Sequence, residues 1–193
     1  DLSRAGKRLM GFCRTNLFKR LESSGQAFIQ SIERHILRNY VYLHAIQTGK
    51  DLPIGTQDAG ILDARIYDED SDSVQATFDV LENNANETVG EETNYLRSED
   101  DFKRRAAEIY DEFASHYRKQ FKWLRPTLFE VALERDLHDD VIALLDMLRK
   151  CGDWDPARDT KLEALYRLLT KDHPEEKVIV FTQFADTVRY LER

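Results

Sequence analysis

The sequence predicts a mainly α-helical fold: a bundle of long helices with an acidic insertion, ending in one strand and one helix of an incomplete α/β domain. Charged residues make up 33% of the 193 residues, with only eight Gly and four Pro, as is typical of helical proteins. Val178–Phe181 alone forms a continuous β-branched and aromatic run, which favours a buried strand. Four consecutive segments follow: a basic long helix (1–50), an acidic insertion (51–101), a helical hairpin (102–152) and the start of the α/β domain (153–193).

The charge of the chain is unevenly distributed, although its net value is -8. Residues 1–38 contain eight Arg and Lys against three acidic residues, so this segment is the one attractive to a phosphate backbone. The acidic remainder argues against autonomous nucleic-acid binding.

The cysteines and the hydropathy argue against several classes of protein. Cys13 and Cys151 are distant in sequence and form no CxxC pair, which disfavours a zinc site or a disulfide framework. There is no signal peptide and no apolar run long enough to span a membrane, so we expect a reduced, cytoplasmic setting. Because the chain starts at Asp1 and ends inside a predicted helix, we also expect an internal piece of a larger protein.

The first predicted helix runs from Leu9 to about Gln47. Gly25 lies on its apolar face, where a missing side chain allows another helix to approach closely, although a helical Gly also costs about 1 kcal/mol relative to Ala. Gly49 is a plausible C-terminal stop. The apolar stripe consists of Leu17, Leu21, Phe28, Ile32 and Ile36.

The next segment is expected to be irregular. Leu52–Gly55 is predicted to be a turn, and between Tyr67 and Asp101 twelve acidic residues face a single basic one, Arg97. This composition indicates an insertion that repels nucleic acid. A solvated excursion and an acidic docking arm for a basic partner are the two interpretations.

Two further helices are predicted at Phe102–Lys122 and Leu128–Arg149, separated by a break at Pro126. Trp154 is expected to pack against the following helix, which Asp159 or Thr160 caps. The predicted bundle core sets the first apolar stripe against Ile109, Phe113, Phe121, Leu128, Val131, Leu144 and Leu148.

The last segment has the order helix, strand, helix. A helix over Lys161–Leu169 precedes the strand, a polar turn follows it, and Thr187–Leu191 begins another helix. This order opens a parallel α/β domain, yet such a domain needs several strands and no residues remain to supply them.

Two stretches resemble a known family. Asp159–Leu169, followed by Lys177–Leu191, resembles the entry into the second RecA-like lobe of Swi/Snf-type superfamily-two helicases and translocases. Leu17–Ser24 resembles a stretch that bacterial members carry ahead of that lobe. The two matches cover roughly a third of the chain and occur in the family's order.

The resemblance implies a segment that links the two lobes of an ATP-dependent motor acting on nucleic acid, most simply duplex DNA, with the other lobes as further partners. ATP and Mg²⁺ would belong to the whole motor and not to this segment. The resemblance places Thr182 and Gln183 beside the nucleic-acid track, and gives Lys19 and Arg20 a contact to DNA or to the other lobe. The alternatives are that Thr182 and Gln183 only cap the next helix, and that the basic residues form a solvated face.

Other chemistry finds little support in the sequence. No GxxxxGK[ST] loop is present, so this segment alone is not expected to hydrolyse ATP. Glu108, Glu112 and His116 share a helix face, but their spacing differs from a di-iron motif and favours an exposed charged face. The pair His138–Asp139 indicates a polar helix junction, and Ser23 with His35 makes no triad.

A second hypothesis is a helical protein-interaction module with no enzymatic parent. The coding sequence on either side separates the two, since a motor requires a phosphate loop upstream and an arginine-bearing motif downstream. A lone strand with unpaired edges also predicts either self-association of the 193-residue piece or a disordered C-terminus.

Overall fold

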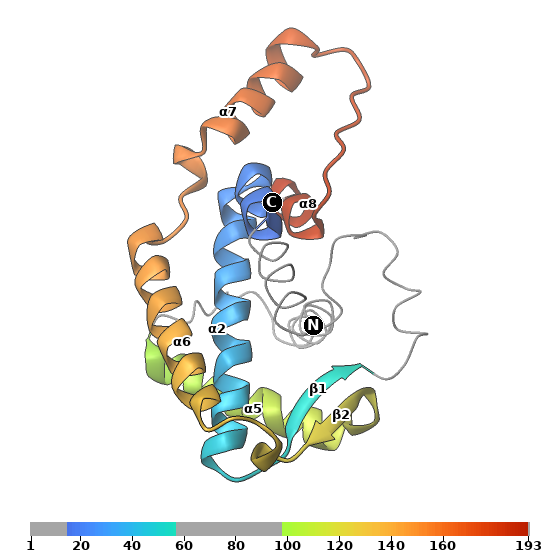
Figure 1. Ribbon diagram of the computed structural model, residues 1–193. Coiled ribbons are helices and arrows are strands. Elements are labelled where there is room, and N and C mark those ends of the chain that lie inside the picture. The colour runs from blue at the N-terminus through green and yellow to red at the C-terminus, as the bar shows by residue number, and fades with distance from the viewer. Residues whose placement is uncertain (1–14, 57–97, 193) are drawn as a thin grey trace. The chain divides into compact units, whose positions relative to one another are not determined.

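The computed structural model describes residues 15–56 and 98–192 of the chain, shown in Figure 1. Most of the acidic segment predicted between Tyr67 and Asp101 lies outside the described residues, as does Cys13. The described part is mainly helical, as predicted, and adds a small two-stranded antiparallel sheet. Among the described residues, no helix is both long enough and apolar enough to cross a membrane.

The chain divides into two compact units that do not follow the four consecutive segments expected from the sequence. The described residues of unit 1 are 15–31 and 151–192, and those of unit 2 are 32–56 and 98–150. Unit 1 is therefore built from two stretches that are distant in sequence, and unit 2 is inserted between them.

Unit 2 contains three long helices and the sheet. Its helices are most of α2 (Gly25–Gln47), α5 (Glu99–Ser115) and α6 (Ala132–Cys151), and its strands are β1 (Leu52–Thr56) and β2 (Phe121–Leu124). Leu52 pairs with Leu124 and Ile54 with Lys122, after which a bulge shifts the register. Gly55, at φ +58°, occupies the bulge, where a positive φ favours glycine.

Two sequence predictions in this region are wrong. Leu52–Gly55 is not a turn but most of β1, and the helix predicted to reach Lys122 ends at Ser115. The reason is tertiary packing: the buried Phe121 ring lies 4.5 Å from the ring of Phe113, an arrangement that the strand β2 provides. Local helix propensity is a weak determinant of structure, and such tertiary packing overrides it here.

The core of unit 2 confirms part of the predicted bundle interior. Ile32 and Ile36 are fully buried, and Ile109, Phe113 and Phe121 are buried with them. The predicted contribution of the following helix is wrong, because α6 begins at Ala132 and leaves the residues before it on the surface. Leu128 is 69% exposed and Val131 98% exposed, Leu144 and Leu148 are half-buried, and the buried residues of α6 are Val141 and Leu145.

Unit 1 combines residues 15–23, which are helical, and the first turns of α2 with two short helices. These are α7 (Thr160–Arg167), which continues as a π-helical turn over Leu168–Asp172, and α8 (Ala185–Leu191). Asp159 caps α7 as predicted, since its carboxylate accepts hydrogen bonds from the backbone N–H groups of Lys161 and Leu162.

The long helix predicted from Leu9 is interrupted within its described part. The break falls at Ser24, whose Oγ accepts a hydrogen bond from the Ala27 N–H at 3.2 Å and so caps α2. The carbonyl of Arg20 still accepts from the Ser24 N–H, so the interruption is confined to one residue. A Ser side chain that competes for backbone donors explains why the helix restarts here.

The strand predicted at Val178–Phe181 is absent. These residues form an irregular segment between α7 and α8, drawn in orange to red in Figure 1, and the sheet of the described residues is the β1–β2 pair alone. Ile179 is 76% exposed and Phe181 91% exposed. A strand needs a neighbour to satisfy its backbone N–H and C=O groups, and the described part offers this segment none.

Candidate functional site

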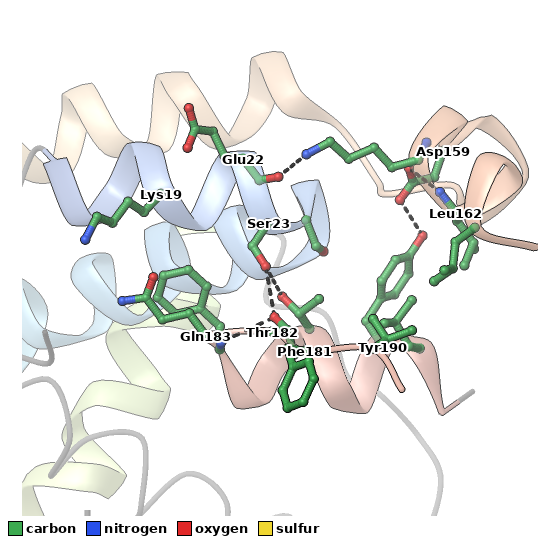
Figure 2. Close-up of a pocket in the computed structure, with 16 residues that line it drawn as sticks. Lys19, Glu22, Ser23, Asp159, Leu162, Phe181, Thr182, Gln183 and Tyr190 are labelled. Atoms are coloured by element: carbon green, nitrogen blue, oxygen red, sulfur yellow. Dashed lines mark hydrogen bonds between the residues drawn. The ribbon is translucent and has the colours of Figure 1, made fainter. Parts of the chain in front are cut away.

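The candidate site is a pocket of about 520 Å³ in unit 1, shown in Figure 2. The helix at residues 15–23, the start of α7 and the segment leading into α8 all contribute to it. Its polar lining combines two ammonium groups, an amide, several hydroxyl groups and two carboxylates, and Leu162 and Leu165 add apolar surface. The charged members are Lys19, Lys161, Glu22 and Asp159.

Three hydroxyl groups meet in this pocket. Ser23 Oγ lies 2.8 Å from Thr187 Oγ1 and 3.3 Å from Thr182 Oγ1, as Figure 2 shows with dashed lines. Thr182 Oγ1 also accepts a hydrogen bond from the Phe184 N–H at 3.4 Å, a local turn that precedes α8. The hydroxyl of Thr182 is therefore held in place from both stretches of unit 1.

A buried ion pair lies close to the hydroxyl groups. Arg20 Nη1 donates to Asp186 Oδ2 at 3.0 Å, and the two side chains are only 9% and 7% exposed. The guanidinium also stacks over the Phe184 ring at 4.7 Å from its centroid. Arg189 lies 3.6 Å from the other carboxylate oxygen, so two cations neutralise Asp186.

A hydrogen-bond chain closes the other side of the pocket. Trp154 Nε1 donates to Tyr190 Oη at 3.0 Å, and the Tyr190 hydroxyl donates to Asp159 Oδ2 at 2.9 Å. Burial is the largest cause that raises the pKa of Tyr190 above its ordinary value, and the Asp159 carboxylate adds to it. Lys161 Nζ donates to the backbone carbonyl of Glu22, which joins α7 to the helix at residues 15–23.

Three of the four predicted site residues come together here. Lys19, Thr182 and Gln183 all line the pocket, with Thr182 half-buried and Gln183 exposed. Arg20 is placed differently: its guanidinium is turned into the unit, onto Asp186. The structure therefore gives Arg20 a packing contact where the resemblance implied one to DNA or to another lobe.

Sequence reasoning missed Asp186, Thr187 and Tyr190 as members of the site. Asp186 was assigned to the polar turn before the last helix, and nothing in its spacing points to a residue 166 positions away. Trp154 was expected to pack against the helix that Asp159 caps, whereas its Nε1 donates to Tyr190 of α8. Ser23 was considered only as a nucleophile, for which the pocket shows no histidine base.

The acidic and histidine clusters do not form a metal site in the described residues, where no group of three such side chains is suitably placed. The helix face of Glu108 and Glu112 is explained by Arg105, whose Nη1 lies 3.1 Å and 3.8 Å from the two carboxylates. His116 Nδ1 lies 2.9 Å from Ser115 Oγ. Salt bridges and local hydrogen bonds thus account for this face.

Comparison of the chain with protein-family models, with curated proteins and with solved structures found no match. The pocket is therefore interpreted from its own chemistry. Hydroxyl, amide and ammonium groups are hydrogen-bond donors suited to a phosphate oxygen. Thr182, Gln183 and Lys19 each supply one of these groups to the pocket lining, and we call these three residues the pocket rim.

Proposed function

We propose that this chain is part of a cytoplasmic, ATP-driven Swi/Snf-type motor that moves along nucleic acid, linking its two lobes and carrying the first motif of the second. One observation supports this most. The stretches that resemble the family are Leu17–Ser24 and Asp159–Leu169 followed by Lys177–Leu191. They are distant in sequence yet lie together in unit 1 and share its pocket. A chance resemblance gives no reason for the two stretches to be neighbours.

In this proposal the rim formed by Lys19, Thr182 and Gln183 contacts the sugar-phosphate backbone of a DNA duplex. The hydroxyl and the amide donate hydrogen bonds, and the ammonium supplies charge. Such contacts position the nucleic acid without reading its sequence. Because the net charge of the chain is -8, they would be local and weak in isolation, and would gain strength from the remaining lobes.

ATP and Mg²⁺ enter the proposal only as ligands of the whole motor. The chain lacks a GxxxxGK[ST] loop, and no metal-ligating cluster occurs in its described residues. No hydrolytic step is therefore assigned to this segment. Its contribution would be mechanical, through its long helices.

DNA binding by the 193-residue chain tests the proposal. A fluorescein-labelled duplex is titrated at low ionic strength with the wild type, Lys19→Ala, and the double variant Thr182→Ala, Gln183→Ala. Both changes should weaken binding. Lys19→Ala should also lower the slope of log affinity against log salt by about 0.9, the value for one lost phosphate contact.

Lys171→Ala is the matched control, because this exposed lysine lies in the π-helical turn and does not line the pocket. It should leave affinity and salt slope unchanged. Equal effects of Lys19→Ala and Lys171→Ala, or no effect of the double variant, would show that the pocket rim is not the contact.

A helical interaction module is the second candidate function, and one observation favours it. Leu128 and Val131 in unit 2 are apolar and close in sequence, and they are 69% and 98% exposed, so together they could form a contact with another protein. A module of this kind predicts that Leu128→Ser and Val131→Ser abolish association with a partner protein and leave DNA binding unchanged. The motor proposal predicts that Lys19→Ala weakens DNA binding and leaves association with a partner protein unchanged.

A further inference from the structure

We propose that Arg20 is a positioning residue: its buried ion pair with Asp186 fixes the segment Thr182–Phe184 against the helix at residues 15–23, and its guanidinium does not itself contact nucleic acid. The inference rests on the proposed function for what this segment binds. It explains how Thr182–Phe184, which pairs with no neighbouring strand among the described residues, keeps its hydrogen-bond donors in one geometry.

Four contacts from the first stretch of the chain hold residues 182–187 on both sides of Gln183. Ser23 Oγ meets Thr182 Oγ1 on one side of Gln183 and Thr187 Oγ1 on the other. The Arg20 guanidinium stacks on the Phe184 ring and pairs with Asp186, both of which follow Gln183. Gln183 and the Thr182 hydroxyl therefore lie between anchored neighbours.

Because the Arg20–Asp186 pair is buried, it fixes the position of the segment more than it adds to the stability of the fold. Removing two charges from water is costly, so a buried ion pair often contributes no more stability than apolar residues of the same size. Loss of one partner is far worse, because the other charge is left buried and uncompensated. With Arg20 and Asp186 each less than a tenth exposed, the segment has one favourable arrangement, in which the pair is made.

The guanidinium suits this task better than an ammonium would. It is planar and directs several N–H groups in fixed directions, so it can face the Phe184 ring and donate to Asp186 at the same time. A lysine is a point charge on a flexible stem and provides no such orientation. The neighbouring Lys19 lines the pocket and is the cation that the proposed function assigns to a phosphate.

The test separates positioning from direct contact through the salt dependence of DNA binding. Three chains are compared with the wild type: Arg20→Ala, Lys19→Ala, and the double variant Arg20→Met, Asp186→Leu, which replaces the pair by apolar side chains. Arg20→Ala should lower affinity about tenfold, the effect of about 1.4 kcal/mol, with the salt slope unchanged. The double variant should recover affinity, whereas Lys19→Ala should lower the slope by about 0.9.

A lower salt slope in Arg20→Ala, or a double variant as weak as Arg20→Ala, would overturn the inference, because either result makes Arg20 a phosphate contact. Amide hydrogen exchange in the free chain provides the second readout. Exchange over residues 182–187 should accelerate in Arg20→Ala and return towards the wild-type rate in the double variant.

Arg189→Ala is the control, since it removes a second cation from the same carboxylate but from a half-exposed position. It should change exchange in this segment much less than Arg20→Ala. Unchanged exchange in Arg20→Ala overturns the inference whatever the DNA result. If the isolated wild-type chain binds too weakly to be measured, the exchange experiment decides the role of Arg20 by itself, and the proposed function is decided separately by DNA-stimulated ATPase activity in the protein that contains both lobes.

Discussion

Gly25 lies directly against the indole ring of Trp154. A Cβ atom built on Gly25 would fall 2.2 Å from two carbons of that ring, far inside van der Waals contact. The sequence predicted that Gly25 permits a close approach, and the partner is a side chain from the second stretch of unit 1. The glycine is thus required by packing at the point where α2 begins.

Gly25→Ala should therefore destabilise unit 1. The gain in helix propensity is about 1 kcal/mol at most, and smaller in a first turn, whereas overpacking a rigid ring costs about 1–3 kcal/mol. Trp154 fluorescence during urea unfolding measures the change, in a Trp123→Phe background that leaves Trp154 as the single tryptophan. Gln26→Ala is the neighbouring control, and a Gly25→Ala chain as stable as that control would contradict the packing argument.

Tyr190→Phe should cost about 1 kcal/mol, because it removes the acceptor of Trp154 Nε1 and the donor to Asp159 at once. The same fluorescence assay measures it. Asp159→Asn keeps a side chain that can cap α7 and accept from Tyr190, so it should cost less. A larger loss in Asp159→Asn than in Tyr190→Phe would show that the carboxylate charge matters more than the hydrogen-bond chain.

The stability of unit 1 should fall above pH 10. Burial raises the pKa of Tyr190 above its ordinary 10.0, so above this pH the unfolded chain loses a proton that the folded chain keeps. The contribution is complete below pH 10 and disappears as the pH rises through the folded pKa. The free energy of unfolding should drop by at most about 1.4 kcal/mol per pH unit from this group, and Tyr190→Phe should flatten the dependence.

Ser98→Ala should weaken the start of α5 in unit 2. Ser98 Oγ accepts from the Asp101 N–H at 3.1 Å, and Asp101 Oδ2 accepts in return from the Ser98 N–H. Loss of such a cap typically costs about 1 kcal/mol. Faster amide exchange confined to the first turn of α5 is the expected result, whereas protection equal to the wild type would mean that packing of the buried Phe102 alone holds this end.

Features set by local interactions could be predicted from the sequence, whereas features set by pairing between distant segments could not. The Asp159 cap and the close approach at Gly25 depend on neighbours along the chain or on the absence of a side chain, and both are confirmed. Val178–Phe181 has the composition of a strand, but a strand exists only where another strand pairs with it. The reverse error occurred at Leu52–Gly55, a proline- and glycine-containing stretch that forms most of β1. Its partner β2 was predicted as the end of a helix and the break after it.

The residues of the candidate site could be predicted in part, but their pairing could not. Thr182 and Gln183 follow an apolar run and stand out in the sequence, while Lys19 and Arg20 are adjacent and chemically alike. Helical periodicity turns these two cations to different surroundings, one lining the pocket and the other buried against Asp186. A single sequence contains no signal for that pairing, because the partner is 166 positions away and is itself an ordinary helix residue.

The most direct test of the proposed motor is its ATPase activity in the protein that contains these residues together with both lobes. Turnover is measured with and without duplex DNA for the wild type and for the double variant Thr182→Ala, Gln183→Ala. We predict that the double variant keeps the basal rate and loses most of the stimulation by DNA. Full stimulation in the double variant, or the absence of any DNA-stimulated turnover in the wild type, would contradict the proposal.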